Sequence, residues 1–218
     1  NVVFDLVSSD TTEASVSPST LTFGKDNWSV PREVTVTGLD DAISDGTISG
    51  AITVAINQDE TKDSGYDALA SRSVVTTISD NDATPTITLT SSDTSVVENL
   101  GAATLTATLS LGAGSVTTVN LNISGNATLN TDYSVSSTSI VISAGSTSGT
   151  ATLTAIADQV DEESETITVD VSGVSGGNGA SENGNQQVSV TITDDDTAAF
   201  TVTQSSGSTS VAESGSSD

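Results

Sequence analysis

The stretch VSVTITDDD, Val188 to Asp196, decides the fold. Apolar and polar residues alternate from Val188 to Ile192, and three aspartates follow directly. A period of two residues is typical of a β-strand that buries one of its faces. A related stretch, VVTTISDND, lies 114 residues earlier, so that Asp80 matches Asp194. The sequence therefore predicts a repeated β-structure whose closing strand ends in carboxylates.

The same alternation recurs along the chain. No stretch shows the 3.6-residue apolar period of an amphipathic helix, and clusters of Gly, Asn, Asp and Ser separate the alternating runs. Short strands at this spacing are typical of β-sandwiches. We therefore predict an all-β fold of tandem immunoglobulin-like sandwiches. The alternating runs include Val2–Leu6, Val34–Val36, Ile52–Ile56, Val74–Ile78, Ile87–Leu89, Leu105–Leu109, Val119–Ile123, Ala151–Ala155, Ile167–Val171 and Val188–Ile192.

A second match sets the domain boundaries. PTITLTSSDTSVVEN, from Pro85, resembles AFTVTQSSGSTSVAES, from Ala199, with Glu98 and Glu213 in matching positions. We therefore expect residues 85–196 to be a complete sandwich, residues 1–84 a sandwich lacking its first strand or strands, and residues 197–218 the first strand of a further repeat. The short junctions predict sandwiches that touch end to end. Within the complete sandwich, the Gly- and Asn-rich segment 173–187 is expected to be a flexible hairpin connection.

The charge of the chain limits its partners. Its 218 residues include 29 acidic and 4 basic side chains, with no histidine or cysteine, and the net charge is -25. No lysine or arginine occurs after residue 84. Such acidity repels nucleic acid and anionic membranes, and no apolar run approaches the ~20 residues that span a bilayer. Two simple interpretations of the acidity are a solubilising surface and a salt-loving source. Without histidine, cysteine or a serine-elbow context, we do not expect an enzyme.

The acidic residues gather where strands are expected to end. Carboxylates this close need a proton or a cation, and an oxygen-only donor set without His or Cys favours Ca²⁺. An EF-hand is excluded, because the segment from Asp41 has Ile43 at its third position and Ile52 at its twelfth. The complete domain offers Glu98, Asp132, Asp158, Asp161, Glu162, Glu163, Glu165, Asp194, Asp195 and Asp196; the partial domain offers Asp10, Glu13, Asp40, Asp41, Asp45, Asp80 and Asp82.

Three motifs of the complete domain resemble the Calx-beta family. They are NATLNTDYSV, IADQVDEESETITVDV and VSVTITDDD, in that order. The resemblance implies a calcium-binding β-sandwich of the kind found in arrays of bacterial surface proteins, and LTFGKDNWSVPREVTVTGLDDAISDG resembles a variant of such arrays. Ala157 stands where the family often has a first aspartate of a pair, which implies fewer ions. Asn81 replaces Asp195 in the first repeat, which implies weaker binding there. The implied ligands are Glu98, Asp132, Asp158, Glu162, Glu165, Asp194, Asp195 and Asp196.

We therefore expect a structural repeat of an extracellular adhesin or surface filament, stiffened by Ca²⁺, with neighbouring repeats as partners. One alternative is a calcium-dependent module that binds a glycan or a protein of a partner cell. Another is a fibre subunit that donates the strand near Phe200–Ser210 to a second chain. A calcium sensor is disfavoured by the repeats. Trp28 is interpreted as a core or strand-edge anchor next to Pro31 rather than a sugar-stacking platform, and no aromatic cluster in the sequence supports the binding module.

Overall fold

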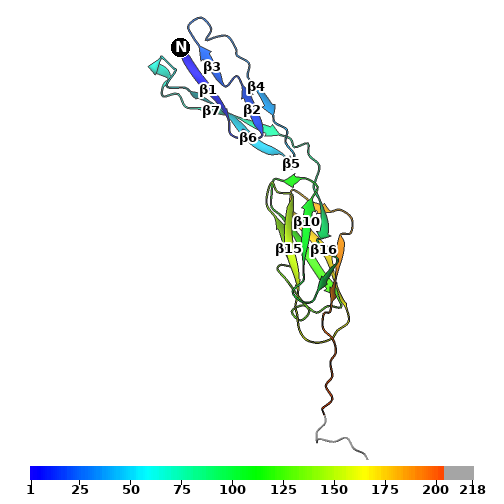
Figure 1. Cartoon of the computed structure of the whole chain (residues 1–218). Coiled ribbons are helices and arrows are strands. Elements are labelled where there is room, and N and C mark those ends of the chain that lie inside the picture. The colour runs from blue at the N-terminus through cyan, green and yellow to red at the C-terminus, as the bar shows by residue number, and fades with distance from the viewer. Residues whose placement is uncertain (204–218) are drawn as a thin grey trace, which may run out of the picture.

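The computed structural model describes residues 1–203, which form two β-units joined end to end (Figure 1). The only helical element in this part of the chain is the 3₁₀ turn η1, Ser64–Tyr66. No helix among the described residues is long and apolar enough to cross a membrane. The all-β sandwich fold predicted from the alternation is confirmed.

The second unit is a sandwich of two five-stranded sheets. One has the strand order β13-β15-β10-β8-β17, and the other has the order β14-β12-β16-β18-β9. Most neighbours are antiparallel, but β17 pairs with β8 and β9 pairs with β18 in parallel. The strands are β8 (Thr86–Ser91), β9 (Ser95–Val97), β10 (Ala102–Leu109), β12 (Thr117–Gly125), β13 (Tyr133–Val135), β14 (Ser139–Ile142), β15 (Ser148–Ala155), β16 (Glu165–Gly176), β17 (Ser181–Glu182) and β18 (Gln187–Thr193).

The core of this sandwich lies between the two sheets. Each strand contributes every second residue, because successive side chains of a strand point to opposite faces. Ile87, Leu105, Val119, Ile167 and Val190 are almost fully buried there. Shortening one such residue to alanine typically costs about 2–5 kcal/mol. A slip of one residue would turn all the apolar side chains of a strand away from the core, so the alternation seen in the sequence specifies the register of each strand.

The first unit repeats half of this arrangement. Its main sheet has the order β3-β1-β6-β7, which corresponds to β14-β12-β16-β18, and its pair β2-β4 corresponds to β13-β15. Within residues 1–203, no counterparts of β8, β9 and β10 accompany these strands. The strands are β1 (Val2–Ser8), β2 (Ala14–Ser17), β3 (Thr20–Phe23), β4 (Thr35–Gly38), β6 (Ile48–Ile56) and β7 (Arg72–Ile78).

A short parallel β-pair joins the two units. β5 (Ile43–Ser44) of the first unit pairs with β11 (Gly112–Ala113) of the second, and the Gly114 N–H donates to the Ser44 carbonyl over 2.9 Å. Ser44 and Ala113 are both buried. The units therefore touch end to end, as the short junction predicts, and the contact is made by main chain.

The Gly- and Asn-rich segment 173–187 connects antiparallel β16 and β18, so the predicted hairpin connection is confirmed, but its contacts hold it in place rather than leaving it flexible. β16 extends into it as far as Gly176, and β17 pairs with β8. The side-chain oxygen of Gln186 also accepts from the Leu89 N–H over 3.2 Å. Glycines with positive φ, such as Gly177 at 57°, allow the tight turns that these contacts need.

The predicted strand of a third repeat is not formed where the tail is described. Residues 197–203 contain no strand, and Phe200 is 90% exposed. Most of that predicted strand, and most of the segment proposed for strand donation, fall in residues 204–218, outside the described residues.

We predict that Gly114→Ala loosens the junction without unfolding either unit. A Cβ on Gly114 would lie 2.4 Å from the Cβ of Asp45 and meets only Asp45 atoms at short range. The parallel pair should therefore separate, while the core between the sheets is untouched. Small-angle scattering should show a broader distribution of overall dimensions than in the parent chain.

Gly173→Ala is the matched control, because a Cβ there meets nothing within 4 Å. The control should scatter as the parent does. A Gly114→Ala chain with the scattering profile of the parent would show that the β5–β11 pair does not hold the junction.

Candidate metal centre

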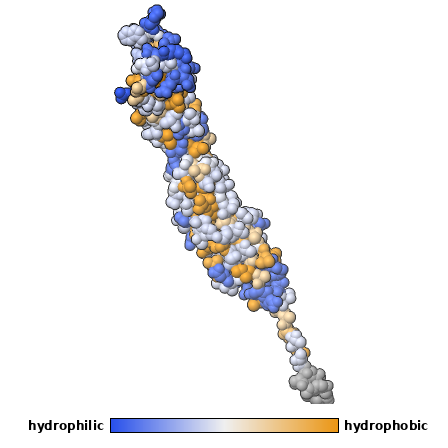
Figure 2. Space-filling model, turned by 90° about the vertical axis from the view of Figure 1, so that its left-hand side faces the viewer, coloured by the Kyte–Doolittle hydropathy of each residue, from blue (hydrophilic) through white to orange (hydrophobic). Residues whose placement is uncertain are grey.

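The eight carboxylates implied by the family resemblance gather at one end of the second unit. They lie just after β9, just before β13, between β15 and β16, at the first position of β16 and just after β18. Figure 2 shows a group of hydrophilic residues at this end, beside the point where the C-terminal tail leaves the sandwich. We call it the acidic pole, defined by Glu98, Asp132, Asp158, Glu162, Glu165, Asp194, Asp195 and Asp196.

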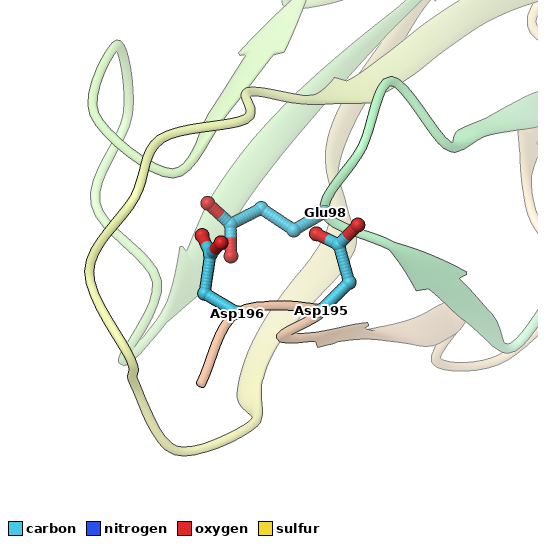
Figure 3. A group of neighbouring side chains, drawn as sticks. All are labelled: Glu98, Asp195 and Asp196. Carbon is cyan, nitrogen blue, oxygen red and sulfur yellow. The ribbon is translucent and has the colours of Figure 1, made fainter. Parts of the chain in front are cut away.

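Strand pairing brings the first group of the acidic pole together. β9 and β18 run in parallel, with Val97 opposite Thr193, and the Glu98 N–H donates to the Thr193 carbonyl over 2.9 Å. The residues that follow the two strands therefore emerge side by side. In Figure 3, Glu98 and Asp196 turn their carboxylates toward each other. Oxygen atoms of Glu98, Asp195 and Asp196 all lie within 4.8 Å of one another.

Glu98 is a buried carboxylate, and a hydrogen bond from the Asp158 N–H offsets little of the cost of burying its charge. Its side chain is 5% exposed, and one oxygen accepts from the Asp158 N–H over 2.9 Å. Burial raises the pKa of Glu98, and Asp194 and Asp158 beside it act in the same direction against that hydrogen bond. A buried negative charge without a cation is costly, so this position favours either a proton or a bound ion.

The second group combines Asp132, Glu162 and Glu165, whose oxygen atoms also lie within 4.8 Å of one another. Asp132 precedes β13, and Glu165 is the first residue of β16. Burial raises the pKa of Glu165 from 4.5 to about 7, with further contributions from a hydrogen bond to Asp132 and from the charges of Asp132 and Glu162. Burial and then the charge of Asp158 raise the pKa of Glu162 as well.

Asp158 links the two groups. Its charge raises the pKa of both Glu98 and Glu162, and its N–H binds Glu98 directly. Asp194 holds the closing turn, where its side chain accepts from the Asp196 N–H over 3.3 Å. All eight predicted residues are therefore close to one another. Whether each binds a metal ion stays a prediction.

The donor set fits a hard cation. In residues 1–203 the only salt bridge joins Lys25 to Asp26, on the exposed surface of the first unit. The acidic pole therefore has no basic side chain to offset its charge, and its side-chain donors are carboxylate oxygens. Such sets suit Ca²⁺ and Mg²⁺ rather than zinc or copper, and a dense group favours Ca²⁺.

A second acidic hollow lies at the junction of the two units. It is lined by Glu13, Asp41, Asp45, Asp80 and Asp82, together with Asn81. Burial and then the charge of Asp80 raise the pKa of Asp45 and of Asp82. Among the described residues, no three carboxylates of this hollow have oxygen atoms within 4.8 Å of one another, so they are less closely grouped than those of the acidic pole.

Asp80 has a structural role in this hollow. One of its oxygens accepts from the N–H groups of Asp45 and Gly46, over 3.1 and 2.8 Å, and the other accepts from Asp82 over 2.7 Å. These hydrogen bonds lower the pKa of Asp80. Asp80 thereby fastens the loop that carries β5 to the end of the first unit.

Asp10 and Asp40 do not line this hollow, and whether they bind a metal ion stays a prediction. Asp10 accepts from the N–H and the hydroxyl of Thr12, which lowers its pKa and closes a local turn. Asp40 accepts from the side-chain amide of Asn81 over 2.9 Å.

Glu13 takes the place that Asp132 has in the second unit. The Leu39 N–H donates to the Glu13 carbonyl over 2.8 Å, as the Ile156 N–H does to Asp132 over 2.9 Å. Comparing the residues before β2 with those before β13 would have favoured Glu13 over Asp10 as a candidate ligand.

Four of the six aromatic residues line one cavity of about 560 Å³ in the first unit, a cluster that is not evident in the sequence. They are Phe4, Phe23, Trp28 and Tyr66. Trp28 is 73% exposed, which excludes a core position. Phe4 and Phe23 are half-buried on β1 and β3, whose counterparts β12 and β14 bury Val119 and Ile142 fully. Within residues 1–203, the two-stranded β2–β4 sheet stands in the place of the five-stranded sheet of the second unit, so the first unit has fewer strands to cover this face.

The comparisons with known proteins agree with the fold. The family model of the Calx-beta domain matches residues 80–196. The chain belongs to the Calx-beta family. No curated protein matches the sequence.

Solved structures of Calx domains are similar to parts of this Calx-beta chain. The apo-form Calx CBD1 domain is 20% identical, with a TM-score of 0.46, over 52% of this chain and 100% of that one. CBD12 from CALX1.2 is 21% identical, with a TM-score of 0.44, over 50% and 44% of the two chains. The calcium binding domain CBD12 of CALX1.1 is 11% identical, with a TM-score of 0.37, over 87% and 85%.

We predict that the cation-free protein loses stability as the pH rises from about 4.5 to about 7. A carboxyl whose pKa is raised by folding stabilises the fold fully below its unfolded pKa, and that contribution is lost as the pH passes the folded value. Glu165 sets this range, and Glu98, Glu162 and Asp196 shift in the same direction. The lowered pKa values of Asp10 and Asp80 act only below their ordinary value of 3.8. Thermal melts in EDTA across this range measure the effect.

Glu165→Gln should make the melting temperature less dependent on pH, because the amide does not titrate. Glu33→Gln, at an exposed position of the first unit, is the matched control and should keep the parent's dependence. Equal pH dependence in the Glu165→Gln and parent chains would contradict the assignment.

Proposed function

We propose that the chain is part of a calcium-binding, load-bearing array of sandwiches outside the cell, in which Ca²⁺ bound at the sandwich ends stiffens the junctions. The observation that carries the proposal is the acidic pole, where eight carboxylates, including buried Glu98, meet without a basic side chain. Membership of the Calx-beta family supports it. Neighbouring repeats are the partners in this proposal.

The junction indicates how an ion would stiffen the array. Asp41 and Asp45 flank β5, which pairs with the next sandwich, while Asp80 and Asp82 lie at the start of the linker. A cation shared by these carboxylates would hold the loop and the linker in one arrangement. Without it, their mutual repulsion acts directly on the segment that makes the contact.

The openness of the sites favours an extracellular location. Asp195 and Glu162 are exposed, and Asn81 provides a neutral oxygen in the first unit. Partly open sites of this kind suit the weak calcium affinities of extracellular modules, roughly 10⁻⁴–10⁻³ M. An adhesin or a surface filament is the setting that combines such sites with end-to-end sandwiches.

We predict that Ca²⁺ binds the protein and that Asp195→Asn weakens this binding about tenfold, or ~1.4 kcal/mol. The substitution removes one of the three charges of the Glu98 group and keeps the size of the side chain. Calorimetric titration with Ca²⁺ measures the change. Asp59→Asn, at an exposed position outside both acidic groups, is the control and should bind as the parent does.

Calcium in large excess over its dissociation constant should also raise the melting temperature by several degrees. An ion that binds only the folded state stabilises it by ~2.7 kcal/mol at a hundredfold excess, and each kcal/mol is worth roughly 2–4 °C in a chain of this size. Absent calorimetric heat, together with identical melts in calcium and in EDTA, would refute the proposal.

A further inference from the structure

The acidic pole repeats the backbone of the junction. Asp41 accepts from the Ile43 N–H over 2.8 Å just before β5, and Asp158 accepts from the Val160 N–H over 2.6 Å. The closing turns match as well, since the Asp82 N–H donates to the Asp80 carboxylate and the Asp196 N–H donates to the Asp194 carboxylate. Val160 and Asp161 therefore occupy the positions that Ile43 and Ser44 have in β5.

Their surroundings differ in one respect. Ile43 and Ser44 pair with β11, and Ser44 is buried by the contact. Val160 is 55% exposed, and within residues 1–203 neither Val160 nor Asp161 has a β-sheet partner. The second unit thus presents, without an occupant, the same edge that the first unit uses to bind its neighbour.

The existing junction defines what can occupy that edge. Gly112 and Ala113 of β11 are followed directly by Gly114, and a Cβ on Gly114 would clash with Asp45. Glu162 occupies the corresponding position next to Val160 and Asp161. A close approach of the two main chains there needs a small residue on the partner, as the turn around β11 provides.

We propose that Val160 and Asp161 form a docking edge that pairs in parallel with the Gly112–Gly114 turn of another Calx-beta sandwich. The Gly114 N–H of the incoming sandwich donates to the Asp161 carbonyl, as Gly114 of this chain donates to Ser44. The inference rests on the proposed array for the presence of a following sandwich, but the pairing itself involves only main chain. The inference thus names the partner of this edge, another Calx-beta sandwich, and the residue pairs that form between the two sandwiches.

An extended chain tests the pairing. Residues 1–196 are followed directly by a second copy of residues 83–196, so that Asp196 precedes Ala83 as Asp82 does in this chain. Amide hydrogen exchange is measured by NMR in excess calcium. The comparison chain carries Gly114→Ala in its second copy only. We expect the amide at position 114 of the second copy to exchange at least about tenfold more slowly in the extended chain than in this comparison chain.

Two controls fix the interpretation. The first-copy Gly114 amide, bonded to Ser44, stays protected in every chain that is correctly folded. Gly173→Ala in the second copy meets open space and should leave position 114 protected. Equally fast exchange at position 114 of the second copy with and without Gly114→Ala, while the first copy stays protected, would overturn the inference.

Calorimetry on the same extended chain separates this inference from the proposed function. Calcium binding without protection of the second-copy Gly114 amide would overturn the docking edge and leave the calcium site standing. Protection of that amide without calcium binding would support the docking edge and refute the calcium site.

Discussion

The repulsion among carboxylates at the strand ends is the interaction on which the structure depends. Two like charges ~4 Å apart repel by roughly 1 kcal/mol in water and several times more near a protein surface. The fold itself creates this repulsion, because the parallel pairing of β9 with β18 brings Glu98 beside Asp195 and Asp196. The sandwich therefore places at its end a charge that it cannot offset, because residues 85–196 contain no lysine or arginine.

The loop between β4 and β6 of the first unit belongs to both the acidic hollow and the junction. Asp41 and Asp45 line the acidic hollow, and β5 between them makes the main-chain contact with the second unit. Asp80 fastens this loop through bonds to Asp45 and Gly46. Any change in the charge of the hollow must therefore reach the contact, since both lie on the same few residues.

The sequence predicts the strands well, because the two-residue period reports directly which face of each strand is buried. It also places the carboxylates of the acidic pole, because they follow strands whose ends lie together. Long-range features could not be predicted: β17 pairs with β8 across about 95 residues, and this orders the glycine-rich segment. The aromatic cavity escaped for the same reason, since Phe4, Phe23, Trp28 and Tyr66 are scattered along the chain.

Protons alone are a poor solution to the repulsion near neutral pH. Glu165, with a pKa of about 7, is about half protonated there and shares its hydrogen bond with Asp132. Even a full proton on Glu165 would neutralise one of the eight carboxylates of the acidic pole. A divalent cation adds two charges at the centre of a group and replaces the hydrogen bonds that a shared proton provides. Because that neutralisation does not fade as the pH rises, a cation rather than a proton is the countercharge that suits this end of the sandwich.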